Sequence, residues 1–190
     1  MAWALPEWTV LALLREEPRH GFAIAALTGP DGEVGRVWQI PRPMIYRALS
    51  RLESAGLIAP VTVESGPGPQ RTVFALTRGG RTTVDAWLRR PVDHVRELRS
   101  HLLMKLALLD RRGMDPGVLL RAQRKVLEPI VVSLKEERDR CAGFDGVLAA
   151  WRHTTANAAL RFVHDLLAGE PDASGAVQAR PARRRTQDGG

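Results

Sequence analysis

Basic and hydroxyl-bearing side chains recur along one side of a predicted helix that runs from Pro43 to just before Gly56. The apolar residues of this stretch return at helical spacing, which would bury one side and expose the other. The exposed side would carry Pro43, Met44, Tyr46, Arg47, Ser50 and Arg51, with Arg42 directly ahead. Arginine can donate two hydrogen bonds to guanine, and hydroxyl groups reach phosphate oxygens. The pattern predicts a helix that enters the major groove of double-stranded DNA, although an ordinary charged surface helix has a similar composition.

A predicted β-hairpin follows this helix directly. Its two segments, 58–64 and 71–77, are rich in β-branched residues, and the turn between them, 65–70, is rich in Gly and Pro. A hairpin directly behind a DNA-reading helix is the wing of a winged helix, so we expect Gln70 and Arg71 to contact phosphates or the adjacent groove. The glycines of the turn do not indicate a nucleotide-binding loop, because neither the P-loop pattern nor a helix follows them.

Two shorter predicted helices precede the DNA-reading helix. They cover residues 5–15 and 22–27, and turn-forming residues occupy 28–33. Two short helices followed by a third are typical of a helix-turn-helix unit. We therefore predict a mainly α-helical chain whose residues 1–91 form a winged helix-turn-helix domain with a two-stranded β-hairpin wing.

The remainder of the chain is predicted to be helical, with helices over 79–90, 95–109, 115–140 and 148–168. The longest helix keeps its apolar residues close to a heptad spacing, so this stripe needs a partner. Neighbouring helices of the same chain are one possibility. A second copy is the other, because a single winged helix usually reads one half-site. The predicted dimerisation residues are Leu120, Leu127, Ile130, Val131, Leu134, Trp151 and Phe162.

The second half of the chain thus divides into two predicted regions. Residues 92–169 are assigned to an α-helical dimerisation domain. Residues 170–190 are rich in Arg, Ala, Gly and Pro, which predicts a disordered basic tail.

The composition supports a polyanionic partner without establishing one. The 190 residues carry a net charge of +7, and the only cysteine is Cys141, which excludes an internal disulfide. The apolar N-terminus lacks a signal-peptide pattern, so we expect a cytoplasmic protein. Neither paired histidines at metal-ligand spacing nor a nucleophile motif occurs in the sequence, and we therefore expect no enzyme activity, no metal and no cofactor.

Four pieces of the sequence, in order, resemble the PadR family of bacterial transcriptional regulators. The resemblance runs from about Leu5 to Val92 and continues more weakly to about Ala168. The pieces are Pro18 with His20-Gly21-Phe22; Trp38, Tyr46, Leu49, Arg51-Leu52-Glu53 and Gly56-Leu57-Ile58; the wing from Gly68 to Thr77; and the helix to Trp87-Leu88, followed by Leu103, Lys105 and Leu106. Pro41 and Pro43 stand where the family usually has a Ser-type cap and Gly, and Arg47 replaces a common Pro. The operator sequence is therefore not transferable from the family.

The resemblance implies a homodimeric repressor whose C-terminal helices mediate dimerisation. Some relatives release DNA when they bind a small aromatic effector, and Trp3, Trp8, Trp87 and Trp151 would be the candidate residues here. Ordinary packing of these tryptophans is the favoured alternative. A winged helix that recognises a protein and no longer binds DNA is a further alternative, against which the arginines of the DNA-reading helix argue.

Overall fold

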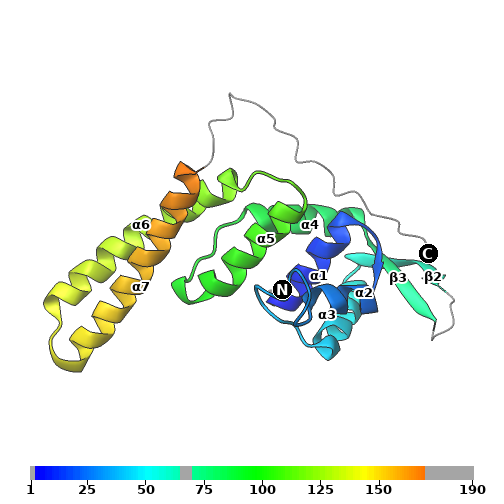
Figure 1. The fold of residues 1–190 in the computed structure, drawn as a ribbon, viewed down its shortest axis with the longest axis horizontal. Coiled ribbons are helices and arrows are strands. Elements are labelled where there is room, and N and C mark those ends of the chain that lie inside the picture. Colours follow the sequence, from blue (N-terminus) through cyan, green and yellow to red (C-terminus); the bar gives the residue numbers. More distant parts are fainter. Residues whose placement is uncertain (1–2, 65–69, 170–190) are drawn as a thin grey trace, which may run out of the picture.

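The computed structural model describes residues 3–64 and 70–169 of the chain (Figure 1). The predicted tail and most of the predicted wing turn lie outside these ranges. The N-terminal half contains α1 (Leu5–Glu16), β1 (Arg19–His20), α2 (Gly21–Thr28), α3 (Arg42–Ser54), β2 (Ile58–Glu64), β3 (Arg71–Leu76) and α4 (Arg78–Arg89). This order of helices, with a β-hairpin behind α3, is the predicted winged helix-turn-helix.

The second half contains α5 (Leu103–Arg111), α6 (Gly117–Arg140) and α7 (Gly143–Ala168). The helices α6 and α7 form a long hairpin that extends away from the winged helix, and α5 lies between the hairpin and α1 (Figure 1). Every helix within residues 3–64 and 70–169 is too short or too polar to cross a membrane.

The helix α3 begins and ends where its sequence requires. Pro41 precedes it without a side-chain cap, because a proline side chain has no acceptor for the first backbone N–H groups. Beyond its C-terminus, Gly56 adopts a positive φ of 68°, a conformation that costs glycine little. The predicted end of the helix just before Gly56 is confirmed.

The sheet has three antiparallel strands in the order β1-β3-β2, whereas the sequence predicted a two-stranded wing. Arg19 and His20 form the additional strand and pair with Phe74 and Val73 of β3. Two residues are too few to show an alternating pattern, so only the folded chain reveals this strand. The register of β2 on β3 shifts between Pro60 and Thr62, which marks a β-bulge.

Two other element boundaries differ from the prediction. Residues 95–109 do not form one helix: a 3-10 turn over Val95–Glu97 and a π-helical turn over Leu98–Leu102 precede α5. Apolar periodicity does not distinguish these windings from an α-helix. The last helix begins at Gly143 instead of at residue 148, because the chain already reverses at the extended Ala142.

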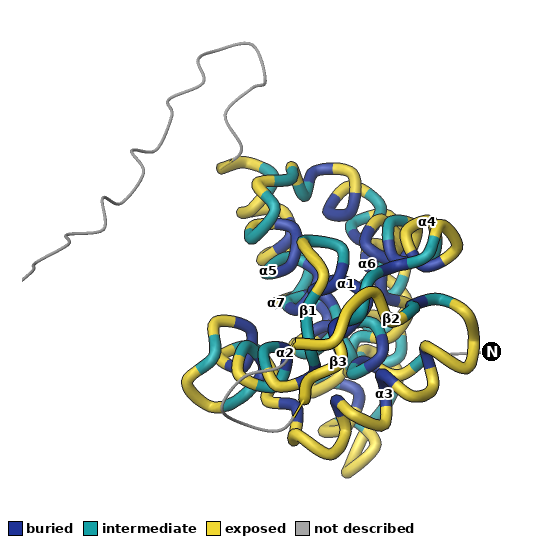
Figure 2. Tube along the Cα trace, turned by 90° about the vertical axis from the view of Figure 1, so that its right-hand side faces the viewer, coloured by how far each residue is buried: buried dark blue, intermediate teal, exposed yellow. Residues whose placement is uncertain are grey.

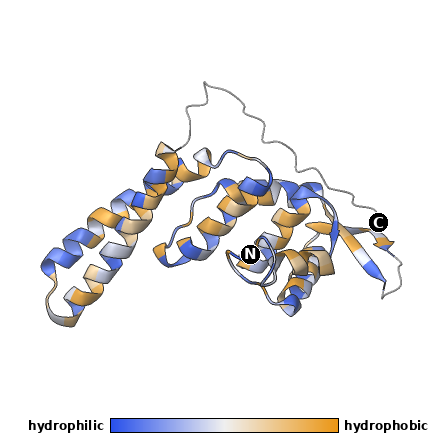
Figure 3. Cartoon of the chain, viewed as in Figure 1, coloured by the Kyte–Doolittle hydropathy of each residue, from blue (hydrophilic) through white to orange (hydrophobic). Residues whose placement is uncertain are grey.

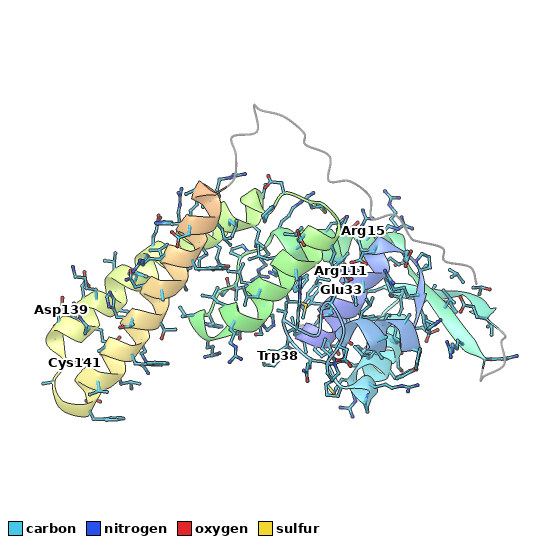
Figure 4. The ribbon with its side chains drawn as sticks, in the orientation of Figure 1. Arg15, Glu33, Trp38, Arg111, Asp139 and Cys141 are labelled. Carbon is cyan, nitrogen blue, oxygen red and sulfur yellow. The ribbon has the colours of Figure 1, made fainter. Side chains whose placement is uncertain are left out.

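A continuous buried core joins the winged helix to α5 and to the first part of α6 (Figure 2). Charged contacts reinforce this junction. Arg111, near the C-terminal end of α5, bonds the Glu16 carboxylate at 2.8 Å with two of its nitrogens and also pairs with Glu33 (Figure 4). Arg15 and Arg112 both reach Asp85 of α4. The helix α5 is thus packed and ion-paired against the winged helix.

Candidate nucleic-acid interface

The helix α3 buries one side and exposes the other, as its sequence predicted. Its buried residues are Ile45, Ala48, Leu49 and Leu52. All seven α3 residues assigned to DNA contact are exposed: Arg42, Pro43, Met44, Tyr46, Arg47, Ser50 and Arg51. The exposed surface continues onto the wing, where Gln70 and Arg71 are also exposed (Figure 2).

Two arginines from different elements converge on one aromatic ring at the base of this surface. The guanidinium carbon of Arg42 lies 5.2 Å from the centroid of the Phe22 ring, and that of Arg71 lies 4.7 Å from the same centroid. Arg42 also donates a hydrogen bond to the Tyr46 hydroxyl at 3.4 Å. These cation–π contacts restrict two long side chains that would otherwise be free. The positive charges of α3 and the wing therefore meet at one place.

The convergence lines a concavity of about 530 Å³ between α2, α3 and β3. His20, Gly21, Phe22, Arg42, Tyr46, Leu49, Gln70, Arg71, Thr72 and Phe74 form its walls. Its lining combines aromatic rings with cationic and polar side chains. Such a surface suits a phosphate and its attached sugar, since cations bind the phosphate and apolar rings cover the sugar.

Gly21 allows α2 and α3 to approach closely at this concavity. A Cβ atom at Gly21 would lie 2.9 Å from Cε1 of Tyr46, which is closer than van der Waals contact permits. The preceding His20 caps α2 by accepting a hydrogen bond from the backbone N–H of Ala23 at its Nδ1 atom, 3.0 Å away. The His-Gly-Phe sequence therefore orients Phe22 and makes room for Tyr46.

Thr77 connects the end of α3, the end of the wing and the start of α4. Its hydroxyl lies 2.9 Å from the carbonyl oxygen of Gly56 and 3.1 Å from that of Leu57. The same oxygen accepts a hydrogen bond from the backbone N–H of Gly80 and so caps α4. The position of the wing relative to α3 depends on this junction.

Arg51 has a different environment from the other candidate DNA-binding residues. Its guanidinium forms an ion pair with Glu7 of α1 and lies 5.4 Å from the ring centroid of Trp3. Glu7 is buried, which the sequence analysis did not predict because acidic residues in a first helical turn are usually exposed. Arg47, one turn earlier, forms neither a side-chain hydrogen bond nor an ion pair with any described residue.

The predicted dimerisation residues separate into two groups. Leu120 and Leu127 are buried inside the single chain, so they do not lie on an exposed face; Ile130, Val131 and Leu134 are half-buried. Trp151 and Phe162 on α7 are exposed, with 69% and 39% of their surfaces accessible. Three further apolar side chains of α7, which were not among the predicted dimerisation residues, are also exposed: Phe144, Val147 and Leu148.

The exposed residues form an apolar stripe along α7. Phe144, Val147, Leu148, Trp151, Phe162 and Leu166 recur at helical spacing, and we name them the α7 stripe. Figure 3 shows hydrophobic segments along this helical hairpin. Two of the predicted α6 positions, Leu120 and Leu127, pack within the chain, and the other three on this helix are partly exposed.

The four tryptophans do not share one face, contrary to the sequence-based suggestion of an effector site. Trp8 and Trp87 stack on each other with ring centroids 5.1 Å apart and planes within 3°. Trp3 covers Arg51, and Trp151 is exposed on α7. Since Trp8 and Trp87 already occupy each other's faces, the structure assigns them to packing.

Comparison with solved structures finds matches at low sequence identity. Bacillus subtilis PadR in complex with operator DNA aligns at 17% identity and a TM-score of 0.46, covering 88% of this chain and 99% of that chain. The virulence activator AphA of Vibrio cholerae aligns at 18% identity and a TM-score of 0.39, covering 87% of this chain and 96% of that chain.

Sequence comparison finds a relative and a family model. The probable transcriptional regulator Rv1176c of Mycobacterium tuberculosis is 29% identical over 118 residues, which span 62% of this chain and 58% of the relative. The family model of the PadR-like transcriptional regulators matches residues 10–86, from α1 into α4. This is a family of regulators and not of enzymes. Residues 10–86, which contain α3 and the wing, are thus similar to the PadR-like family of transcriptional regulators.

Proposed function

We propose that this protein is a dimeric, sequence-specific regulator that binds double-stranded DNA through α3 and the wing. The observation that carries the proposal is the convergence of Arg42 and Arg71 on Phe22, beside the exposed face of α3. Two elements thereby present cations to the same region of space, as the backbone and groove of a duplex require. The net charge of +7 supports the same partner.

The residues of the surface divide into two roles in this proposal. Arg47 and Ser50, which project from α3, would contact base edges in the major groove, and Met44 would contact a thymine methyl group. Arg42, Tyr46 and Arg71 would hold the DNA backbone at the concavity, and Gln70 would lie at the adjacent groove. We leave Arg51 outside the base-reading set because its guanidinium pairs with Glu7.

Dimerisation would occur through the α7 stripe. An exposed apolar row of this kind on a long helix is stabilised when a second copy covers it. Two winged helices related by a two-fold axis would then read two half-sites. A dimer that covers a promoter blocks transcription, so we propose repression as the mode of action. Release by a small aromatic effector stays a prediction of the family resemblance, without the tryptophan site first suggested for it.

The experiment that tests DNA binding is a gel shift on the DNA upstream of the protein's own gene, titrated with salt and non-specific competitor. A discrete complex that survives competitor and weakens steeply with salt would support the proposal. If neither this fragment nor a genomic fragment library gives such a complex, the alternative of a protein-binding winged helix is favoured.

The same assay separates the two roles of the arginines. Arg47→Ala is expected to lose roughly 1–3 kcal/mol of discrimination between the operator and a mismatched site. Arg71→Ala is expected to weaken all duplexes about equally and to reduce the salt slope by about 1. Arg121→Ala, which removes an exposed arginine of α6, is the matched control and should bind as the parent does. Parent-like binding by both test variants would contradict the assignment.

A further inference from the structure

Residues 90–92, which we call the linker, connect α4 to the C-terminal helices. The linker is held by a side chain from α6. Gln123 accepts a hydrogen bond from the backbone N–H of Val92 at 2.7 Å and donates one to the carbonyl oxygen of the same residue at 2.9 Å. Gln123 is fully buried, and Val92 is buried with it. A side-chain amide is suited to this double contact because it offers one donor and one acceptor side by side.

A second buried side chain holds the linker from α5. The Nζ atom of Lys105 donates a hydrogen bond to the carbonyl oxygen of Arg90 at 2.5 Å. The same nitrogen lies 4.8 Å from the ring centroid of Trp87, the residue that stacks on Trp8 of α1. Lys105 is buried, although lysine is seldom buried without a specific partner. The linker is therefore fixed to two C-terminal helices through its own backbone.

These contacts determine how freely the α6–α7 hairpin can turn relative to the winged helix. A rotation about the linker would break the three hydrogen bonds and leave buried polar groups without partners. Such groups are costly in a dry environment, so the angle between the two parts has a single preferred value. The three hydrogen bonds act at residues 90–92 in addition to the apolar core that joins the winged helix to α5 and to the first part of α6.

We propose that Gln123 and Lys105 are positioning residues that fix the distance between the two recognition helices of the dimer, and thereby its selectivity for half-site spacing. The inference rests on the proposed function. If the α7 stripe joins the two copies, the rigid path from α7 through α6 and the linker to α3 sets where each α3 lies on the duplex. Neither residue contacts DNA in this proposal.

The first test measures spacing selectivity. Duplexes are selected from a random library by the parent protein, and one base pair is then inserted between the half-sites, which rotates one of them by about 35° relative to the other. The parent is expected to lose affinity about tenfold or more, within the usual range of coupling between sites. For Gln123→Leu the ratio of the two dissociation constants should fall toward one, while affinity for a duplex with a single half-site stays unchanged.

The second test measures the angle without DNA. Spin labels are attached at Thr82→Cys on α4 and Thr154→Cys on α7, both exposed positions, in a Cys141→Ser background diluted with unlabelled protein. The parent is expected to give one narrow distance distribution. Gln123→Leu and Lys105→Met should broaden or shift it, because each removes a contact to the linker.

A matched control separates this role from general destabilisation. Leu127→Val shortens a buried side chain of the same helix that is not bonded to the linker, and it should keep the parent's distance distribution and spacing selectivity. Parent-like distances in Gln123→Leu would overturn the inference. If the parent protein selects no duplex, the proposed function and the spacing role are both refuted. The spin-label distances would still show whether the linker contacts fix the angle between the winged helix and the α6–α7 hairpin.

Discussion

Arg47 and Arg51 lie one turn apart on the exposed side of α3 and differ in the contacts of their side chains. Arg51 neutralises the buried carboxylate of Glu7, so its removal would leave that group without its cation. We expect Arg51→Ala to lower the free energy of unfolding by roughly 2 kcal/mol, the usual cost of a buried polar group that loses its partner. Arg47→Ala should change it by less than about 0.5 kcal/mol.

Urea unfolding of the two variants tests this difference. The second substitution Glu7→Gln removes the orphaned charge and should restore part of the stability of Arg51→Ala. Equal stability of the two single variants would show that the Glu7–Arg51 pair makes no net contribution.

Lys105 makes the stability of the protein depend on pH. Burial, with a smaller contribution from Arg90, lowers the pKa of Lys105 from 10.5 to about 8, and Asp93 partly opposes the shift. Above about pH 8 the unfolded chain therefore binds more protons than the folded one, so stability should rise between about pH 8 and 10. The full difference is roughly 3 kcal/mol. Relative to the parent, Lys105→Met should lack this rise in thermal unfolding profiles.

Lys125→Met is the matched control for this profile, because Lys125 is exposed on α6. It should reproduce the parent's dependence on pH. A rise that persists unchanged in Lys105→Met would mean that another group titrates in this range.

At the scale of the elements, the junction at Thr77 holds the wing against α3 and α4. Thr77→Val keeps the shape of the side chain but removes the hydroxyl that caps α4 and bonds the residues after α3. We expect the melting temperature to fall by an amount equivalent to about 1–2 kcal/mol, as for other lost N-terminal caps. Thr77→Ser should retain most of the stability. A parent-like melting temperature in Thr77→Val would show that the cap is not needed.

Much of this layout could be predicted from the sequence, because α1, α3 and the β2–β3 hairpin each contain a strong local pattern. The strand β1 could not, since two residues carry no periodicity. The features that the sequence did not predict depend on contacts between residues far apart in the chain. The ion pair of Arg51 joins residues that are 44 positions apart, and no spacing rule relates them.

The predicted dimer surface shows the same limit of sequence-based prediction at a larger scale. Apolar periodicity correctly indicated that the C-terminal helices have an apolar side, but it could not distinguish the positions that pack within the chain from those left exposed. Leu127 and Trp151 were both predicted to lie at the dimer interface, yet the first is buried and the second is exposed. Which of the two residues is buried depends on how the α6–α7 hairpin packs in the folded chain.

For the whole molecule, the α7 stripe predicts a two-chain assembly that a single charge would disrupt. Trp151→Arg places a cation at an exposed apolar position, so sedimentation velocity should show the mass of one chain instead of two. Affinity for a full operator should fall, while affinity for a half-site stays the same. His164→Arg adds the same charge on a different side of α7 and should remain dimeric. A dimer of Trp151→Arg would place the interface elsewhere.

The bulge at Pro60 has a consequence for how copies of the protein associate. The strand β2 lies at one edge of the sheet, and an open edge is a template for strand addition and aggregation. Pro60 lacks a backbone N–H, and the register shift between Pro60 and Thr62 interrupts the regular ladder. At the opposite edge, β1 offers only two residues. Both edges of the sheet are thus poor templates for fibril growth.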